Sequence, residues 1–532
     1  MENTGNANRQ IARAAGTVMI AIVFGQLIGL ARGVIVARAF GASSELDAFV
    51  FANRVCETLF LLVAGGALGS TFLPAFTGLL TKDDKVSAWR LASSLGNTVT
   101  LTLSLLAVLI ALFAPQVIRY AIAPGIAEDP ELFALTVSLL RVQLLSAVLF
   151  GIGGLIVGIL NARQVFLIPA LTPAVYQLGI IFGAVVLAPS MGVYGLAWGV
   201  VIGALFYVLI QIPSLLKQNG KYSPILGWND GNTRQVIILM GPRLLGVAVV
   251  QLNFWVNNIL ASSMESGSAA SLSFSFSLMI MAQAAIAQSV AIAAMPTFSA
   301  QHALGKLDEM RLSLAASLRG ILLLAFPASV GLIVLRVPLI SFLYQRGKFD
   351  EQDVQFTAWA LLWYAAGLVG HSIMEVLTRA FYAQQDTKTP VIIGVIAMGS
   401  NVIFSITFSK LFEQAGWIPV GGLALANSLA TAFEAAALFV FMRRRLNGIE
   451  GRSIADGAWR VSLAALEMGV GLWLWIQVTA EMDRWLVALG GVALGAVLYS
   501  AGVILIKVPE IIIIIDALKK RLLRSASRHS SQ

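Results

Sequence analysis

The chain has 532 residues, of which 58% are hydrophobic and only 12% are charged, and its mean hydropathy is +0.84. A soluble domain carries roughly twice this charged fraction, so the composition excludes a soluble globular protein. The net charge of +9 does not indicate nucleic-acid binding, because the basic residues fall in short loops, where membrane proteins retain them. The single Cys56 lies in an apolar stretch and predicts neither a disulfide nor a metal centre.

Fourteen apolar stretches follow one another along the chain, each long enough to cross a bilayer core of about 30 Å. No strand-like alternation recurs at the period of about ten residues that a membrane barrel shows. The sequence therefore predicts an all-α polytopic membrane protein with 14 transmembrane helices. We expect these helices at about 16–40, 47–76, 87–114, 131–161, 165–188, 192–216, 234–262, 268–295, 312–336, 354–382, 388–410, 418–442, 457–480 and 484–508.

Loop charges predict the orientation of these helices. The polar, weakly basic segment 1–16 lacks a clear cleavage site, which indicates a cytoplasmic lead-in rather than a removed signal peptide. Basic residues recur in alternate loops, and several of the intervening loops carry acidic residues. This alternation predicts that both termini are cytoplasmic, with an even number of helices between them.

An internal repeat is visible at an offset of about 222 residues. LPAFT (73–77) corresponds to MPTFS (295–299), and the exit of the fourth helix corresponds to that of the tenth. Two six-helix repeats related by a pseudo-two-fold axis are typical of rocking-bundle transporters, whose site lies between the halves. The predicted domains are an N-terminal lobe (1–220), a C-terminal lobe (221–446), helices 13 and 14 (447–508) and a cytoplasmic basic tail (509–532).

Polar and ionisable residues interrupt the first two predicted helices. Such a residue at membrane depth costs a few kcal/mol, so it faces a partner or a water-filled cavity rather than lipid. Arg32 is the strongest candidate for an anion ligand, because a guanidinium can hold a phosphate bidentately; the alternative is an internal ion pair with Glu57. Arg54 and Glu57 are spaced i, i+3 and can pair with each other. Gln26 is a polar neighbour, and Arg38 is interpreted as an interfacial anchor.

The seventh predicted helix carries a polar stripe preceded by Arg243 and formed by Gln251, Asn253, Asn257 and Asn258. The stripe is either a set of interhelical hydrogen bonds or the lining of a hydrophilic cavity. We favour a lining, because the corresponding part of the first helix carries Gln26 and Arg32.

One face of the tenth predicted helix carries His371, Glu375 and Arg379, spaced i, i+4 and i+8. His371 and Glu375 are candidates for a proton or cation relay, and a buried structural pair is the alternative.

Motifs of hydrolytic or redox enzymes do not occur in the sequence: there is no HExxH, no P-loop and no GxSxG in a strand context. We therefore expect a transporter without a cofactor or metal, not an enzyme. Without a phosphate-binding motif, transport is expected to draw on an ion gradient such as that of a monovalent cation, on the membrane potential, or on the gradient of the substrate itself.

Six stretches carry a resemblance to a known family: LARGVIVARAFGASSELDAF (30–49), GALGSTFLPAF (66–76), APG (123–125), GPRLLGVAVVQLN (241–253), YQRGKFDEQD (344–353) and RAFYAQQDTKTPV (379–391). Through them the chain resembles, over nearly its whole length, the lipid II flippase family (MurJ, also called MviN) of the MOP exporter superfamily. The resemblance implies a V-shaped transporter with a cationic cavity lined by helices 1, 2, 7 and 8. It also implies a groove of helices 13 and 14 for an undecaprenyl tail.

The resemblance implies roles for individual residues. Arg32 matches a cavity arginine of the family, Asp47 an acidic residue at the outer end of helix 1, and Arg54 a basic residue early in helix 2. Gly33 stands where the family often has an acidic residue, and Gln26 and Ser277 stand where it has arginine. Phe60 and Leu61 likewise replace arginines of helix 2, and AGGA (64–67) replaces the family's AEGA. Either the remaining cations suffice for a diphosphate, or the chain carries a different substrate.

We predict a flippase of the bacterial inner membrane that moves the undecaprenyl-diphosphate-linked peptidoglycan precursor, lipid II, outward by alternating access. The expected partners are this lipid, membrane lipids and cell-wall synthesis enzymes, with no nucleic acid. The alternatives are export of another lipid-linked oligosaccharide, cation-coupled drug antiport, and a silent membrane scaffold. The predicted substrate-binding residues are Arg32, Arg54, Arg243, Glu57, Asp47, Gln26, Gln251 and Asn257.

Overall fold

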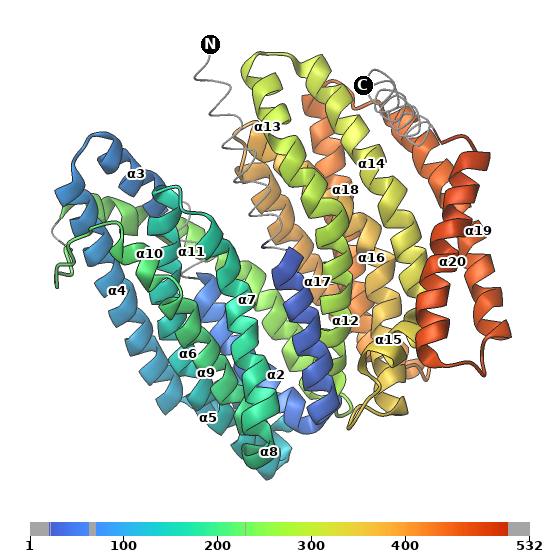
Figure 1. Cartoon of the computed structure of the whole chain (residues 1–532), viewed down its shortest axis with the longest axis horizontal. Coiled ribbons are helices and arrows are strands. Elements are labelled where there is room, and N and C mark those ends of the chain that lie inside the picture. Colours follow the sequence, from blue (N-terminus) through green and yellow to red (C-terminus); the bar gives the residue numbers. More distant parts are fainter. Residues whose placement is uncertain (1–20, 22, 63–70, 229, 509–532) are drawn as a thin grey trace, which may run out of the picture. The chain divides into compact units, whose positions relative to one another are not determined.

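The structure is a computed structural model that describes residues 21, 23–62, 71–228 and 230–508 (Figure 1). These residues form helices joined by turns and by a longer connection at 217–228, and no strand occurs among them. The predicted all-α class is therefore confirmed. The predicted lead-in 1–16 and the basic tail 509–532 lie outside the described residues.

The chain divides into two compact units, Met1–Ser271 with Tyr344–Asp353, and Leu272–Leu343 with Val354–Gln532. The lobe boundaries that we predict from the internal repeat stay a prediction. The first unit contains a helix at Val23–Phe40, followed by α2 (Ser44–Phe60), α3 (Leu73–Thr81), α4 (Lys85–Leu112), α5 (Ala114–Val117), η2 (Ile118–Ile122), η3 (Pro124–Glu128), α6 (Pro130–Ala162), α7 (Leu167–Phe182), η4 (Gly183–Leu187), α8 (Ala188–Met191), α9 (Val193–Leu209), α10 (Ile212–Leu216) and α11 (Gly231–Ser262).

Aspartates begin several helices of the first unit. Asp84, Asp129 and Asp230 precede α4, α6 and α11, and each side chain accepts a hydrogen bond from a backbone N–H of the first turn. Such N-caps contribute about 1 kcal/mol each. The hydrogen bond from the Ser87 backbone also holds the pKa of Asp84 below its usual range, so this cap is ionised at neutral pH.

Glycines allow α9 to pack directly on α7 and η4. A Cβ on Gly179 would lie 2.2 Å from the Cα of Gly203, and one on Gly183 would lie 2.4 Å from the carbonyl oxygen of Gly195. Because lipid provides little hydrophobic drive for helix association, close backbone packing of this kind supplies much of the free energy that holds the helices together. The glycines of these helices are therefore part of the core of the first unit.

The second unit places α14 against α19, α17 against α18, and α19 against α20. A core cluster of this unit includes the buried Phe298, Leu318, Leu377 and Leu438. Its elements are α12 (Ser268–Gln283), whose first residues belong to the first unit, η5 (Ala284–Gln288), α13 (Ser289–Ala303), α14 (Leu307–Val334), α15 (Arg336–Tyr344), α16 (Glu351–Ala383), α17 (Lys388–Gln414), α18 (Val420–Arg445), α19 (Gly451–Val478) and α20 (Arg484–Leu505).

An ion pair fixes the turn between α16 and α17 to the end of α18. Arg445 Nη1 donates to Asp386 Oδ2, which also accepts a hydrogen bond from the Thr389 hydroxyl. Burial raises the pKa of Asp386, but the hydrogen bonds from Thr389 and the Arg445 charge outweigh it and hold that pKa at about 2. The pair is therefore fully charged at neutral pH.

Corresponding positions of the two sequence repeats share unusual backbone conformations. Gln164 and Gln385, which follow α6 and α16, both have φ of +60°, an uncommon value for a residue other than glycine. The helix breaks before Pro115, between α4 and α5, and again before Pro338, between α14 and α15. Residues 61–62 are π-helical, as is η5 at the corresponding place of the second repeat.

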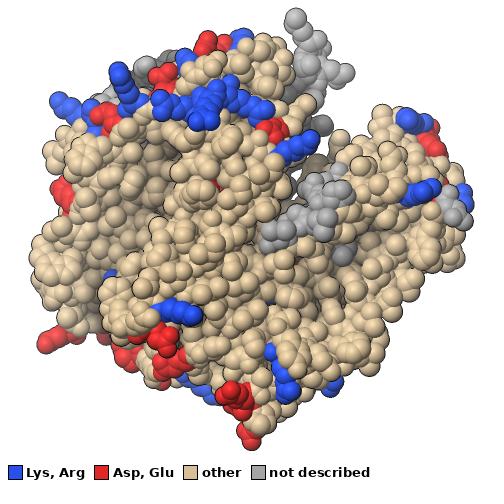
Figure 2. All heavy atoms as spheres, turned by 180° about the vertical axis from the view of Figure 1, so that it is seen from behind, with Lys and Arg blue, Asp and Glu red and all other residues tan. Residues whose placement is uncertain are grey.

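Twelve of the described helices are long and apolar enough to cross a membrane, so the exact count of 14 is not confirmed. The two predicted helices missing from this set are the second and the seventh. Helix α11 forms over 32 residues, and the described part of the second predicted helix is α2, with 17 residues. On the face shown in Figure 2, most Lys and Arg side chains lie toward the top and the bottom of the view, and the surface between them is mostly uncharged.

Candidate functional site

The predicted substrate-binding residues all belong to the first unit. The side chain of Arg243 is not among those that the structure describes. The others lie on three helices of this unit: Gln26 and Arg32 on Val23–Phe40, Asp47, Arg54 and Glu57 on α2, and Gln251 and Asn257 on α11.

Two contacts hold the guanidinium of Arg54. Its Nη1 donates to Glu57 Oε2 at 2.8 Å, and its Cζ lies 4.9 Å from the ring centre of Phe254 on α11. The predicted i, i+3 pair is thus present. The Arg54 side chain is 19% exposed, and its buried Nε has no hydrogen-bond partner among the described residues. An arginine held on an aromatic ring keeps its orientation and retains donors for an anion.

A hydrogen-bond chain aligns α2 with α11 beside Arg54. Trp255 Nε1 donates to Thr58 Oγ1 at 2.9 Å, and Thr58 Oγ1 donates to the Arg54 carbonyl oxygen at 2.8 Å. Thr58 is buried, so this chain is protected from competing water. It fixes the register in which Phe254 lies beside the guanidinium.

Arg32 is partly exposed and has no hydrogen-bond or ion-pair partner among the described residues. Glu57, its alternative partner from the sequence, is paired with Arg54 instead. Arg32 lies within electrostatic range of Tyr176 on α7 and of Tyr344. The guanidinium therefore keeps its full capacity to bind an anionic ligand.

Buried amides on α11 extend this polar surface. Gln251 Oε1 and Asn258 Nδ2 are buried and have no hydrogen-bond partner within the described part of the chain. Asn253 and Asn257 both have partners. A buried amide group left unpaired costs about 1–3 kcal/mol, which indicates a place for an ordered water or a polar group of a ligand.

Asp47 is buried and caps the N-terminus of α12. Its Oδ2 accepts a hydrogen bond from Gly267 N, and its Oδ1 accepts one from Ala270 N, each at 2.7 Å. A carboxylate at this position also interacts favourably with the helix dipole. Both oxygens thus serve the fold, and the predicted contact of Asp47 with substrate stays a prediction.

Segments distant in sequence meet beside Asp47. Asp353 Oδ2 accepts a hydrogen bond from Ala42 N at 2.9 Å, and Lys348 N donates to the Arg38 carbonyl oxygen at 3.0 Å. Gly267 has φ of +85°, and a Cβ there would lie 2.0 Å from the Ala42 carbonyl oxygen. Stretches 30–49 and 344–353, which carry the resemblance, are therefore joined through their backbones. Asp353 was not among the predicted site residues, although its position in the stretch 344–353 was a usable signal.

His371 and Glu375 lie in the second unit and have separate partners. His371 Nε2 is 3.2 Å from Asn427 Oδ1 on α18, and Glu375 Oε1 accepts a hydrogen bond from Arg379 Nη2 at 3.1 Å. The structure gives no hydrogen bond between His371 and Glu375 among the described residues. The proton or cation relay stays a prediction.

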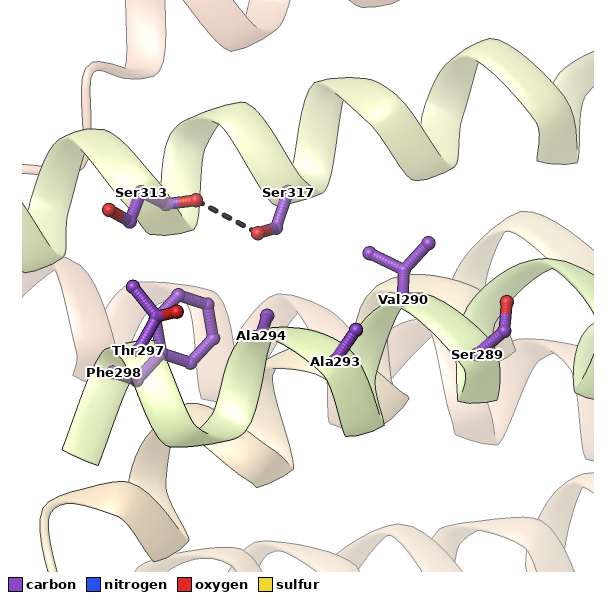
Figure 3. A pocket seen from close by; sticks show the side chains of 8 residues that line it. All are labelled: Ser289, Val290, Ala293, Ala294, Thr297, Phe298, Ser313 and Ser317. Carbon is purple, nitrogen blue, oxygen red and sulfur yellow. Dashed lines mark hydrogen bonds between the residues drawn. The ribbon is translucent and has the colours of Figure 1, made fainter. Parts of the chain in front are cut away.

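Two pockets are lined by residues other than Arg32 and Arg54. In the first unit, a pocket of about 570 Å³ separates α3 from the start of α11 and is lined by Thr71, Lys82, Asn232 and Gln235 among others. In the second unit, a pocket of about 430 Å³ lies between α13 and α14 (Figure 3). Its hydroxyls come from Ser289, Thr297, Ser313 and Ser317, and Ser317 donates to the Ser313 carbonyl oxygen at 2.9 Å. Neither pocket was predicted from the sequence.

The arrangement in the first unit suits binding of an anion. It supplies guanidinium and amide groups on α2, α11 and the first helix, with aromatic rings beside them. No group of three or more His, Cys, Asp or Glu side chains that could hold a metal ion occurs among the described residues. These groups can hold and orient a phosphorylated ligand by charge and hydrogen bonds.

Comparison with known proteins gives the same family from sequence and from structure. The family model described as "Lipid II flippase MurJ" matches residues 36–489. The lipid II flippase MurJ of Burkholderia cenocepacia is 30% identical over 441 residues, covering 81% of this chain and 84% of that protein. A probable lipid II flippase MurJ of Vibrio cholerae is 30% identical over 445 residues, covering 81% and 83%.

Among solved structures, the chain is similar to a lipid II flippase MurJ in an inward closed conformation, with a TM-score of 0.78 and 25% identity. This match covers 91% of this chain and 97% of that one. An inward-facing multidrug resistance transporter of the MATE family, from the MOP superfamily, matches with a TM-score of 0.68 and 16% identity, over 81% of this chain and 98% of that one. The second likeness shows a shared fold.

Proposed function

This chain belongs to the lipid II flippase MurJ family, and from that premise we propose that it carries lipid II across the bacterial inner membrane from the cytoplasmic to the outer face. Like its relatives, it is a multi-pass transporter rather than an enzyme. The carried head group contains a diphosphate, so the protein must provide cations within an otherwise apolar bundle.

The Arg32 guanidinium, for which the described residues provide no ion pair, is the observation that carries the proposal. A positive charge in a membrane helix without an ion pair among the described residues requires compensation, and a diphosphate supplies it. Arg54 assists from α2, where Phe254 fixes its orientation. Arg243 is the third cation of the proposed site.

Polar groups around these arginines complete the proposed site. Gln251 and Asn257 on α11 and Gln26 on the first helix contact the sugar or peptide part of the head group. Glu57 holds Arg54 until substrate arrives, and exchange of the carboxylate for a diphosphate then links binding to a change in α2. The Arg54–Glu57 pair is partly exposed, with a strength of about 0.2–1 kcal/mol, so a dianionic ligand can displace it.

The proposal also includes a surface for the lipid tail and an orientation in the membrane. Helices α19 and α20 expose large apolar side chains such as Trp473, Val492 and Val497, which suit contact with an undecaprenyl chain. Arg443, Arg444 and Arg445 end α18, and a cluster of this kind supports a cytoplasmic location for that end and for both termini. Cell-wall synthesis enzymes are proposed partners, and His371 with Glu375 is a proposed relay for a monovalent cation.

The test is complementation of a lipid II flippase depletion strain by this chain and by single-residue variants. We expect the wild type to restore growth and Arg32→Ala to fail, because the diphosphate loses its unpaired cation. Arg38→Ala is the matched control, since Arg38 lies on the same helix with an exposed side chain and is interpreted as an anchor.

Each other outcome has a definite meaning. Growth supported by Arg32→Ala at wild-type protein levels would remove Arg32 from the transport path. Failure of a well-expressed wild type would favour the second candidate function, export of another lipid-linked oligosaccharide. That candidate rests on Gln26, Gly33 and Ser277, which stand where the family usually carries charge. In the structure Ser277 donates its hydroxyl to the Ser273 carbonyl oxygen of its own helix.

A further inference from the structure

A line of polar side chains runs along the inner face of α18, in the second unit. Asn427, Thr431 and Glu434 are spaced i, i+4 and i+7, so they lie on one face of the helix. They are 7%, 2% and 8% exposed, while the neighbouring Phe433 is 47% exposed. Glu434 therefore lies inside the helix bundle near the middle of an apolar span, where an ionisable group needs a functional reason.

Glu434 has no hydrogen-bond or ion-pair partner among the described residues. Its Oε1 lies against Gly394 of α17, where a Cβ would be 3.3 Å away. Because Gly394 has no side chain, it offers neither a donor nor a charge to the carboxyl group, which packs directly against the α17 backbone. Glu434 thus differs from Glu375, which is paired with Arg379.

The charged and titratable groups on α16, α17 and α18 either have partners of their own or lie toward the helix ends. On α17, Lys388 is the first residue, and Lys410 and Glu413 lie near the other end. On α16, His371 contacts Asn427, Glu375 and Arg379 form their own pair, and Tyr382 lies in the last turn. On α18 itself, Arg443, Arg444 and Arg445 lie in the last turn.

A carboxylate buried without a partner is strongly disfavoured, so the neutral acid is the form that this bundle accommodates. Release of the proton requires that water reach the carboxyl group, because the anion and the hydronium ion must both be solvated. Two conformations that differ in hydration at Glu434 would therefore differ in proton affinity. Such a difference is what couples a proton to a conformational change.

We propose that Glu434 is a proton-binding site of the transport cycle, loaded in one conformation and unloaded in another. The step is the transfer of a proton from the carboxyl oxygen to water, which leaves a carboxylate and a hydronium ion, and its reversal on the other side of the cycle. The inference rests on the proposed function, because it assigns a coupling ion to lipid II transport. The ligand is a proton, and the buried Glu434 carboxyl group is the group that binds it.

The test reconstitutes the full chain into vesicles of phosphatidylethanolamine and phosphatidylglycerol and measures flipping of fluorescently labelled lipid II. Rates are compared with and without a pH gradient, while potassium and valinomycin hold the membrane potential at zero. We expect the wild-type rate to change with the gradient. In Glu434→Gln, which keeps the size of the side chain but cannot release a proton, the ratio of the two rates should fall to unity.

Glu467→Gln is the matched control, because Glu467 is also a carboxylate within an apolar span but is exposed on α19. It should keep the wild-type ratio. A wild type that flips the lipid without responding to the pH gradient would overturn the inference and leave the proposed function intact, as would an unchanged response in Glu434→Gln. A wild type that moves no lipid II would overturn the proposed function itself, and with it the coupling role of Glu434.

Discussion

Individual polar residues within the apolar helices differ in what they contact. Arg54 has a carboxylate and an aromatic ring, Arg32 has no ion pair among the described residues, and Asp47 is saturated by backbone N–H groups. The same residue types in similar stretches of sequence therefore have different roles. A saturated carboxylate stabilises the fold, and an unsaturated cation is available to a ligand.

Asp47 provides a prediction at this scale. Asp47→Ala should lower the thermal unfolding midpoint of the detergent-solubilised protein, because it leaves the Gly267 and Ala270 N–H groups unpaired, at about 1–3 kcal/mol each. Glu45→Ala, in the same turn of α2 but exposed, is the control and should have little effect. Equal midpoints for the two variants would contradict the capping role. Lipid II affinity of the folded Asp47→Ala protein tests the predicted substrate contact separately.

Whole helices show a comparable division between framework and site. Helices α7 and α9 are apolar and pack through glycines, whereas α2 and α11 carry the arginine, carboxylate and amide groups. The candidate site therefore lies on helices that carry polar side chains, and the framework beside it is built from apolar helices.

The glycine contact between α7 and α9 gives a prediction at the scale of the element. Gly179→Ala should lower the unfolding midpoint by several degrees, because the new Cβ would lie 2.2 Å from the Cα of Gly203 and must push α9 away. Gly331→Ala, within α14 where nothing lies within 4 Å, makes the same chemical change without a clash. It should leave the midpoint unchanged or raise it, since alanine favours a helix over glycine by about 1 kcal/mol. A lower midpoint for Gly331→Ala than for Gly179→Ala would refute this account.

At the scale of the whole molecule, the segment 217–228 connects the two six-helix repeats, and it is bound along α4. Asn97 Nδ2 donates to the Ser223 and Ile225 carbonyl oxygens at 3.1 and 2.9 Å, and Asn97 Oδ1 accepts from the Tyr222 hydroxyl at 2.9 Å. The connection therefore belongs to the first unit and holds the start of α11 close to α4. Helix α11, the first helix of the second repeat by sequence, also contacts α2, η2 and η3 and is part of the first unit.

Asn97→Ala should release this segment. Three hydrogen bonds are lost, so we expect faster hydrogen–deuterium exchange and faster proteolysis within 217–228, with the exchange of α6 unchanged. Thr102→Ala, an exposed change on the same helix, is the control and should behave as the wild type. Equal exchange in both variants would mean that the segment is held by contacts other than those of Asn97.

The sequence by itself determined the helical class, the repeat and the family, because apolar length, loop charge and motif spacing are properties of the chain. It also showed that Arg54 and Glu57 can pair, since i, i+3 spacing brings two side chains close together on any helix. Only the tertiary structure decided that Glu57 does not pair with Arg32, that Asp47 caps α12, and that Glu434 is left without a partner among the described residues. These outcomes depend on which helices pack together and in what register, and residues far apart in sequence fix that register.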